Sequence, residues 1–221
     1  MFPHPPFRLA RFLGAFVCLA LVCPATPAHA VVDGEVSVSP WVGTLYLDAD
    51  LGDFRWNTSA QTVWGASAHV RKGRLAAGAR AWRGSTRQSV GTPSDPATVD
   101  VNLTGVDALG EARLMSLLGV RLVATGAVGA LHIGWSPSSI ELPGLGESVR
   151  VDFDPIREAS FSTGLAVRRS LIGGFGVAVG AERSWFHLDT AHRRGNEIVN
   201  ERTLFGTWTA RIELSRSVLQ L

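Results

Sequence analysis

The feature that most constrains the fold is an alternation of apolar residues with small or polar ones, which recurs in several windows after residue 30. Phe175, Val177 and Val179 alternate with glycine and alanine, and residues 207–214 alternate threonine, arginine and glutamate with apolar residues. A period of two residues places the two kinds of side chain on opposite faces of a β-strand. The chain is therefore predicted to be all-β, with two strand faces in different surroundings.

Clusters of glycine, proline, aspartate and asparagine divide the alternating windows into eight predicted strands. The predicted strands are 36–48, 61–71, 74–84, 101–117, 120–135, 157–169, 174–188 and 201–215. Three connections are tight, at 72–73, 118–119 and 170–173. Four are long and polar, at 49–60, 85–100, 136–156 and 189–200. Short turns on one side and long loops on the other are typical of an eight-stranded antiparallel up-and-down transmembrane β-barrel.

The first 30 residues contain the three regions of a secretory signal peptide. Arg8 and Arg11 form a basic region, residues 12–23 are apolar, and Ala28-His29-Ala30 matches an A-x-A cleavage site. The sequence therefore predicts export and cleavage after Ala30. It assigns residues 1–30 to the signal peptide and residues 31–221 to a single barrel domain.

The composition of the remaining chain argues against several functional classes. Both cysteines, Cys18 and Cys23, lie in the predicted signal peptide, so no thiol remains for a disulfide or a thiolate metal site. The formal net charge of +2 equals the charge of the two arginines in residues 1–30, which contain no acid, so the mature chain is formally neutral. We therefore predict no nucleic-acid partner. No cofactor is predicted, since the glycines near residue 176 miss the spacing of a nucleotide-binding loop.

The polar strand faces decide which side of the predicted barrel is inside. They carry acids and arginines in equal number, and a membrane barrel turns such a face inward. We predict structural ion pairs in the lumen among Arg80, Arg113, Arg168, Arg211, Glu111, Glu158, Glu182 and Glu213. The alternative is a soluble periplasmic barrel that turns these charges to solvent and binds an apolar ligand inside. The apolar face is rich in alanine, glycine and valine, which would make a thin core for that alternative.

A second alternative is a membrane-spanning helix. Residues 114–135 are apolar enough to suggest one. However, this window contains Arg121 and His132, and a tight turn is predicted at 118–119. Burying an arginine in a single bilayer helix is costly, so two strands are favoured.

The tryptophans provide a weaker test of the membrane interpretation. Trp41, Trp64, Trp135 and Trp185 lie towards predicted strand ends, as expected for interfacial belts. Trp82 falls on the polar face and Trp208 in mid-strand, so scattered core tryptophans remain the alternative.

Enzymatic and metal sites were considered, and no catalytic or metal-ligating residue is predicted. Ser184, His187 and Asp189 lie close in sequence near the end of one strand, which keeps a lipid acyl-chain hydrolase or transferase open as an alternative. Ser184 and His187 have opposite strand parity, which separates a nucleophile from its base. Asp48, Asp50 and Asp53 have only part of the spacing of a calcium loop.

The long connections are predicted to be the working parts of the molecule. Residues 85–100 and 136–156 are rich in serine, threonine, proline, glycine and aspartate, and lack a periodic apolar face, so plain exposed loops are expected. The exceptions are Ile140, Leu142 and Leu145, which are suited to form a small cap over the lumen.

Taken with the hairpins at 72–73 and 170–173 and the closing strand 204–214, the chain resembles the small eight-stranded outer-membrane β-barrels of Gram-negative bacteria, of the OmpA-transmembrane-domain and OmpX type. The resemblance covers residues 31–221. It implies an integral outer-membrane protein with a closed lumen and a structural or surface-interaction role. Its implied partners are outer-membrane lipid and lipopolysaccharide, the outer-membrane assembly machinery and an unidentified surface partner. Members usually end in an aromatic residue, whereas this chain ends in Leu221, and its alternation slips near 215–217.

Overall fold

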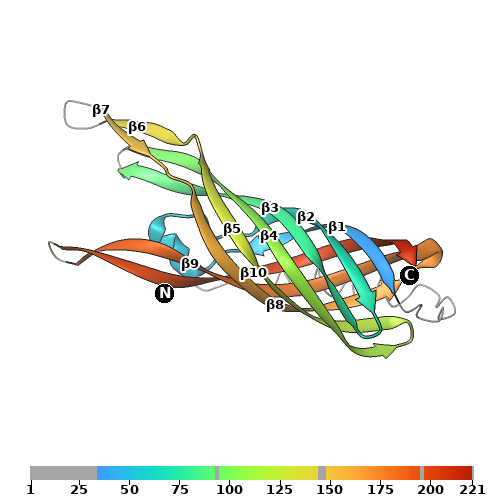
Figure 1. Cartoon of the computed structure of the whole chain (residues 1–221). Helices are drawn as coiled ribbons and strands as arrows, with labels where there is room; N and C mark the ends of the chain where they lie inside the picture. The colour runs from blue at the N-terminus through green and yellow to red at the C-terminus, as the bar shows by residue number, and fades with distance from the viewer. Residues whose placement is uncertain (1–33, 93–94, 144–147, 195–196, 221) are drawn as a thin grey trace.

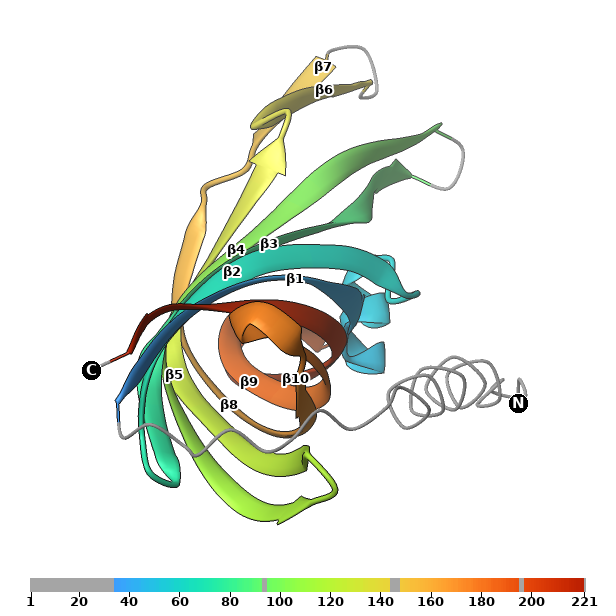
Figure 2. The same ribbon diagram turned by 90° about the vertical axis from the view of Figure 1, so that its right-hand side faces the viewer.

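The computed structural model describes residues 34–92, 95–143, 148–194 and 197–220. The predicted signal peptide lies outside the described residues. Eight strands form one closed antiparallel barrel in the order β1-β10-β9-β8-β5-β4-β3-β2 (Figures 1 and 2). Their bounds are β1 Glu35–Tyr46, β2 Gln61–Lys72, β3 Leu75–Thr92, β4 Asp95–Leu117, β5 Val120–Ser136, β8 Ile156–Ser170, β9 Phe175–Arg194 and β10 Glu197–Gln220. The prediction of an eight-stranded up-and-down barrel is confirmed.

Tight turns join β2 to β3, β4 to β5, and β8 to β9, the last through the short 3-10 segment η2, Ile172–Gly174. The long connections all lie at the opposite end of the barrel (Figure 1). The barrel closes where β1 pairs with β10, from Glu35 opposite Gln220 to Tyr46 opposite Trp208. The register of this seam shifts by one residue at Val218, next to the predicted slip.

Two of the predicted long loops are largely strand, which corrects the sequence analysis. Residues 85–92 and 95–100 continue β3 and β4 as a paired ribbon, with Thr92 opposite Asp95. Residues 189–194 and 197–200 likewise extend β9 and β10. A ribbon of this kind satisfies its backbone hydrogen bonds by pairing with itself, so its polar composition does not prevent strand formation.

The connection 136–156 also contains strands. β6, Ser139–Pro143, pairs with β7, Ser148–Asp152, in a separate two-stranded sheet. Ile140 lies opposite Val151 in this hairpin, and Leu142 lies opposite Val149, while Leu145 lies outside the described residues. The hairpin projects away from the barrel (Figures 1 and 2), so Ile140 and Leu142 do not form the cap expected over the lumen.

The connection 49–60 enters the barrel instead. It contains a 3-10 helix, η1, Ala49–Phe54, whose Leu51 is fully buried. The carboxylate of Asp48 caps η1 by accepting a hydrogen bond from the Asp50 amide at 3.2 Å. It also accepts one from the Gly206 amide of β10 at 2.9 Å. Asp48 is thus a tether between η1 and the barrel wall, a role its sequence neighbours did not indicate.

Inward-facing residues divide the lumen into two tiers. At the hairpin end they form an apolar cluster, here called the apolar tier. Its buried members are Trp41, Leu45, Leu47, Leu51, Trp56, Val63, Val101, Leu103, Leu131, Ile133, Phe186, Leu188 and Phe205. Towards the tight turns the inward residues are charged, and these form the charged tier described below. The sequence analysis predicted charge along the whole interior, so the apolar tier is a correction.

The outer face next to the charged tier is apolar. Val42, Val106, Val128 and Leu165 each expose about half or more of their side chains. Trp64 and Trp208 are similarly exposed, whereas Trp41 is only 6% exposed and points into the barrel, contrary to the predicted interfacial position. Its parity explains this, because Trp41 shares the inward face of β1 with Ser37 and Ser39. Among the described residues, no helix is long and apolar enough to cross a membrane.

Candidate functional site in the barrel lumen

The centre of the charged tier is a carboxylate shared by two arginines. Glu182 of β9 receives a bidentate pair of hydrogen bonds from Arg80 of β3, at 2.7 and 2.8 Å. Arg211 of β10 donates to the same carboxylate at 2.6 Å. All three side chains are at least nine-tenths buried. Charge-assisted bidentate pairs are among the stronger hydrogen bonds in proteins, so Glu182 joins strands that lie on different sides of the lumen.

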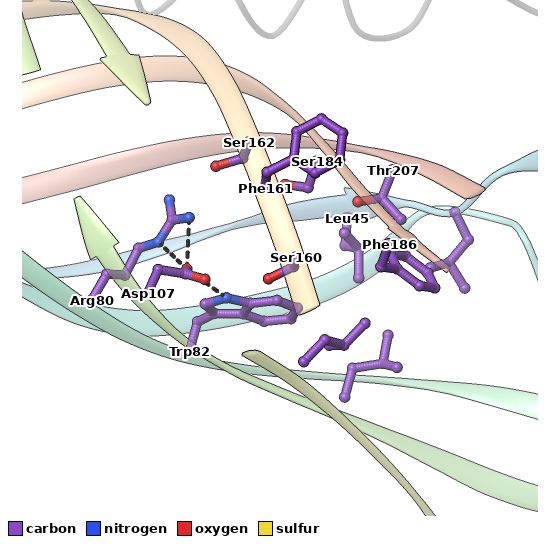
Figure 3. A pocket seen from close by; sticks show the side chains of 13 residues that line it. Leu45, Arg80, Trp82, Asp107, Ser160, Phe161, Ser162, Ser184, Phe186 and Thr207 are labelled. Carbon is purple, nitrogen blue, oxygen red and sulfur yellow. Dashed lines mark hydrogen bonds and ion pairs between the residues drawn. The ribbon is translucent and has the colours of Figure 1, made fainter. Parts of the chain in front are cut away.

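Asp107 of β4 completes the other side of Arg80. The Arg80 Nε donates to Asp107 Oδ2 at 2.9 Å, and the Trp82 indole N–H donates to the same oxygen at 3.2 Å. Figure 3 shows Arg80 and Trp82 converging on Asp107. Gly105 makes room for this arrangement, since a Cβ at that position would collide with the Trp82 indole. The absence of a side chain at Gly105 is therefore what lets Trp82 lie against the barrel wall.

A second centre lies nearer the tight turns. Arg168 of β8 donates to Glu111 of β4 at 2.6 Å and to Glu213 of β10 at 3.2 Å. Glu213 also lies 4.0 Å from Arg211, which connects the two centres. At the mouth, Arg71 of β2 lies 3.6 Å from Glu111 and 3.5 Å from Glu35 of β1.

These contacts form one unbroken chain in which acids and arginines alternate. In order, the chain is Asp107, Arg80, Glu182, Arg211, Glu213, Arg168, Glu111, Arg71 and Glu35. It draws side chains from seven of the eight barrel strands, with β5 as the exception. Every charge along it has an opposite charge as neighbour, which offsets the cost of removing these groups from water.

Six of the eight residues predicted to pair in the lumen belong to this chain. The other two lie elsewhere. Glu158 lies at the hairpin end of β8 and pairs with the exposed Arg202 at 2.7 Å. Arg113 lies at the mouth, where it lines a small pocket with Arg71, Arg74 and Arg121. The pairing of β4 with β5 shifts register just after Arg113, which ends the regular alternation there.

The sequence analysis assigned no pairing role to Asp107, Arg71, His69 or Glu35. Asp107 and Arg71 had been placed on the polar face by parity, so the alternation carried their signal, but their partners lie across the lumen. His69 is fully buried in β2, with its Nε2 3.6 Å from Glu111 Oε1. A histidine at an inward position of an otherwise small-residue strand was the available signal for it.

The space between the two tiers is narrow. It is lined by Arg80, Trp82 and Asp107 on one side and by Leu45, Leu103 and Phe186 on the other (Figure 3). The volume open to the centre of a water molecule is about 20 Å³, room for one or two waters. Eight strands leave an interior that side chains can just fill, and here they nearly do so.

The residues considered for acyl-chain chemistry are not assembled into a catalytic group. Ser184 faces the lumen and lines this narrow space. His187 lies on the alternate face of β9, and Asp189 lies 3.5 Å from Arg202 at the hairpin. Within the described part of the chain, no group of three histidine, cysteine or acidic side chains is placed to hold a metal ion.

No protein-family model matches the sequence, and no curated protein matches it. Solved structures do resemble the fold. Neisserial surface protein A is 10% identical, covers 83% of this chain and 96% of its own, and has a TM-score of 0.46. The outer membrane protein AlkL is 13% identical, with 90% and 95% covered and a TM-score of 0.45. Ail of Yersinia pestis is 11% identical, with 83% and 97% covered and a TM-score of 0.39. The chain thus resembles small outer-membrane β-barrels, and its function is argued below from its own residues.

Proposed function

We propose that the protein is an integral outer-membrane barrel with a plugged lumen, which anchors its projecting hairpins at the cell surface and has no enzymatic activity. The observation that carries this proposal is the ion-pair chain across seven strands, with the apolar tier stacked above it. A charged interior under an apolar outer face is the arrangement of a membrane barrel, and the reverse of a soluble one.

The plug has two independent layers. Ions would have to displace the buried pairs around Glu182 and then pass the cluster that contains Leu51 and Phe205. Neither layer provides a continuous wet path, because the space between them holds only one or two waters. A porin-like channel is therefore excluded from the proposed function.

The hairpins provide the proposed working surface. The ribbons of β3 with β4 and β9 with β10, together with the β6–β7 hairpin, project beyond the barrel (Figure 1). Rigid elements that carry exposed polar ribbons are suited to present a surface to an unidentified partner. The other proposed partners are the lipid and lipopolysaccharide around the barrel, and the assembly machinery that inserts it.

Two measurements test this proposal. Outer-membrane fractionation, followed by gel electrophoresis of heated and unheated samples, should show a membrane-bound barrel with heat-modifiable mobility. The purified protein in a planar lipid bilayer should then show no steady conductance under conditions in which a known porin conducts. Recovery in the soluble periplasmic fraction would contradict the membrane placement. Steady ohmic conductance would contradict the plug.

A further inference from the structure

One arginine on the outside of the barrel is held in an unusual setting. The guanidinium carbon of Arg183, on β9, lies 5.3 Å from the ring centre of Trp185 and 5.6 Å from that of Trp208 on β10. Trp185 is itself stacked on Phe161 of β8, with ring centres 5.1 Å apart. A cation held over aromatic faces keeps its charge while its position is restrained. Arg183 is thus fixed at one place on the outer wall.

The charge of Arg183 is not neutralised by the protein. None of the ion pairs among the described residues includes Arg183, in contrast with Arg80, Arg168 and Arg211 in the lumen. The neighbouring Glu182 points inward and is already shared by two arginines. The five N–H donors of an arginine are arranged to bind a planar or tetrahedral oxyanion, and here they are left for a ligand outside the barrel.

The backbone opposite Arg183 leaves space for such a ligand. Gly206 of β10 lies beside the guanidinium, since a Cβ there would be 3.4 Å from both Arg183 Nε and one terminal nitrogen. A larger side chain at Gly206 would crowd or cover the donors. The glycine therefore keeps the guanidinium accessible between the two indoles.

The height of this group on the barrel indicates which ligand reaches it. Along β9 the inward residues change from Glu182 and Ser184 to the buried Phe186, and along β10 they change from Thr207 to the buried Phe205. This change marks the level at which the outer surroundings pass from lipid to water. Arg183 and Trp185 lie at that level, where tryptophans and lipid headgroups occur together.

We propose that Arg183, between Trp185 and Trp208, binds the phosphate group of a lipid in the leaflet on the hairpin side. This inference rests on the membrane placement proposed above. The guanidinium forms charge-assisted hydrogen bonds with the phosphate oxygens. The apolar outer face below, which includes Val179 and Ile212, contacts the acyl chains. That face favours a lipid-borne phosphate over a free one.

The test is native mass spectrometry of the detergent-solubilised barrel titrated with phosphatidic acid, with phosphatidylcholine as the comparison lipid. Arg183→Ala should weaken the binding of the first phosphatidic acid about 10-fold, the loss expected for a charge-assisted pair. Arg183→Lys should be intermediate, because lysine keeps the charge but not the fork of donors. Arg87→Ala is the matched control, since Arg87 is an exposed arginine on β3 that pairs with Asp100 at 3.4 Å.

Each outcome decides the matter. Equal binding by the parent and Arg183→Ala would overturn the site, and an equal loss in Arg87→Ala would reduce it to diffuse electrostatic attraction. Displacement of phosphatidic acid by inorganic phosphate at similar concentration would show that the ligand is free phosphate and overturn the lipid assignment. Heat-modifiable mobility of every variant is checked first. A barrel that inserts but lacks selectivity overturns only this inference, whereas failure to insert overturns the membrane placement as well.

Discussion

The charged tier and the apolar tier are built on the same eight strands, but they reverse the relation between inside and outside. Beside the charged tier, Asp107 points inward and its neighbour Val106 is exposed on the outer wall. Four residues further along β4, Leu103 points inward, and Asn102 on the outer wall receives a hydrogen bond from Arg83. The alternation keeps its phase while its polarity reverses. This comparison teaches that each tier is solvated from outside by a different medium, lipid for one and water for the other.

The two tiers also differ in how they are stabilised. The charged tier depends on complete pairing, because a buried charge that loses its partner is left uncompensated. The apolar tier depends on packing, and its losses scale with the volume removed. Substitutions in the two tiers should therefore differ in kind as well as in size.

The largest effect is expected at Glu182. Replacing it in Glu182→Ala leaves Arg80 and Arg211 without their shared partner, which should lower the free energy of unfolding by about 3–5 kcal/mol. Urea unfolding in lipid vesicles measures this. Glu158→Ala is the matched control, and it should cost less than about 1 kcal/mol because its partner Arg202 is exposed. Equal costs for the two variants would show that Glu182 is not buried in the lumen.

The next effect concerns the level of the membrane boundary. Val106→Arg places a charge on the outer wall beside the charged tier and should cost about 2–4 kcal/mol in a lipid bilayer. Asn102→Arg, on the same face of β4, should cost only about 0–1 kcal/mol because it lies at the watery level. The same vesicle unfolding experiment compares them. If the two substitutions cost the same, the reversal of polarity does not mark the membrane edge.

A smaller effect is expected from loosening the apolar tier at its mobile contributor. Leu51→Ala removes a fully buried side chain from η1 and should cost about 2–3 kcal/mol, at the low end of the usual range because a connection relaxes more readily than a strand. The barrel itself should remain closed to ions in the planar bilayer, since the ion pairs of Glu182 are untouched. Conductance in this variant would mean that η1 alone is the plug.

The smallest effect is expected at the tether of η1. Asp48→Ala removes both the cap on the Asp50 amide and the bond from the Gly206 amide. The loss should be about 1 kcal/mol and local, since caps contribute about that amount. Hydrogen exchange resolved by segment should become faster in residues 49–56 and stay unchanged in β5. Unchanged exchange in 49–56 would show that packing of Leu51 holds η1 without the tether.

The sequence was sufficient for the barrel and for most of the charged tier. Strand number, order and the inward parity of Arg80, Arg168 and Glu182 all follow from a period of two residues, which is a local signal. The partners within the tier were less accessible. Asp107 and Arg80 are neighbours across β3 and β4, but the pairing of Arg80 with Glu182 joins residues about a hundred positions apart, and the tilt and stagger of the strands set it.

The apolar tier was missed for a different reason. Val99 and Val101 lie in a segment whose composition resembles a loop, and their inward positions are apolar where the rest of the strand is polar. A reader of the pattern sees a break in alternation where the chain only changes its outer solvent. The burial of Leu51 has no periodic signal at all, because a single 3-10 turn is too short to show one.

The closing seam between β1 and β10 has a consequence for the order of assembly. Seven of the seams between barrel strands join segments that follow each other along the chain, whereas this one joins Glu35 to Gln220. Hairpins form from local contacts, but the closing contact must wait until the last strand has been made. Until then β1 and β10 each present an unpaired edge, which is a template for association with other chains. A chain truncated before β10 would keep β1 and β9 as open edges, however stable its other hairpins were.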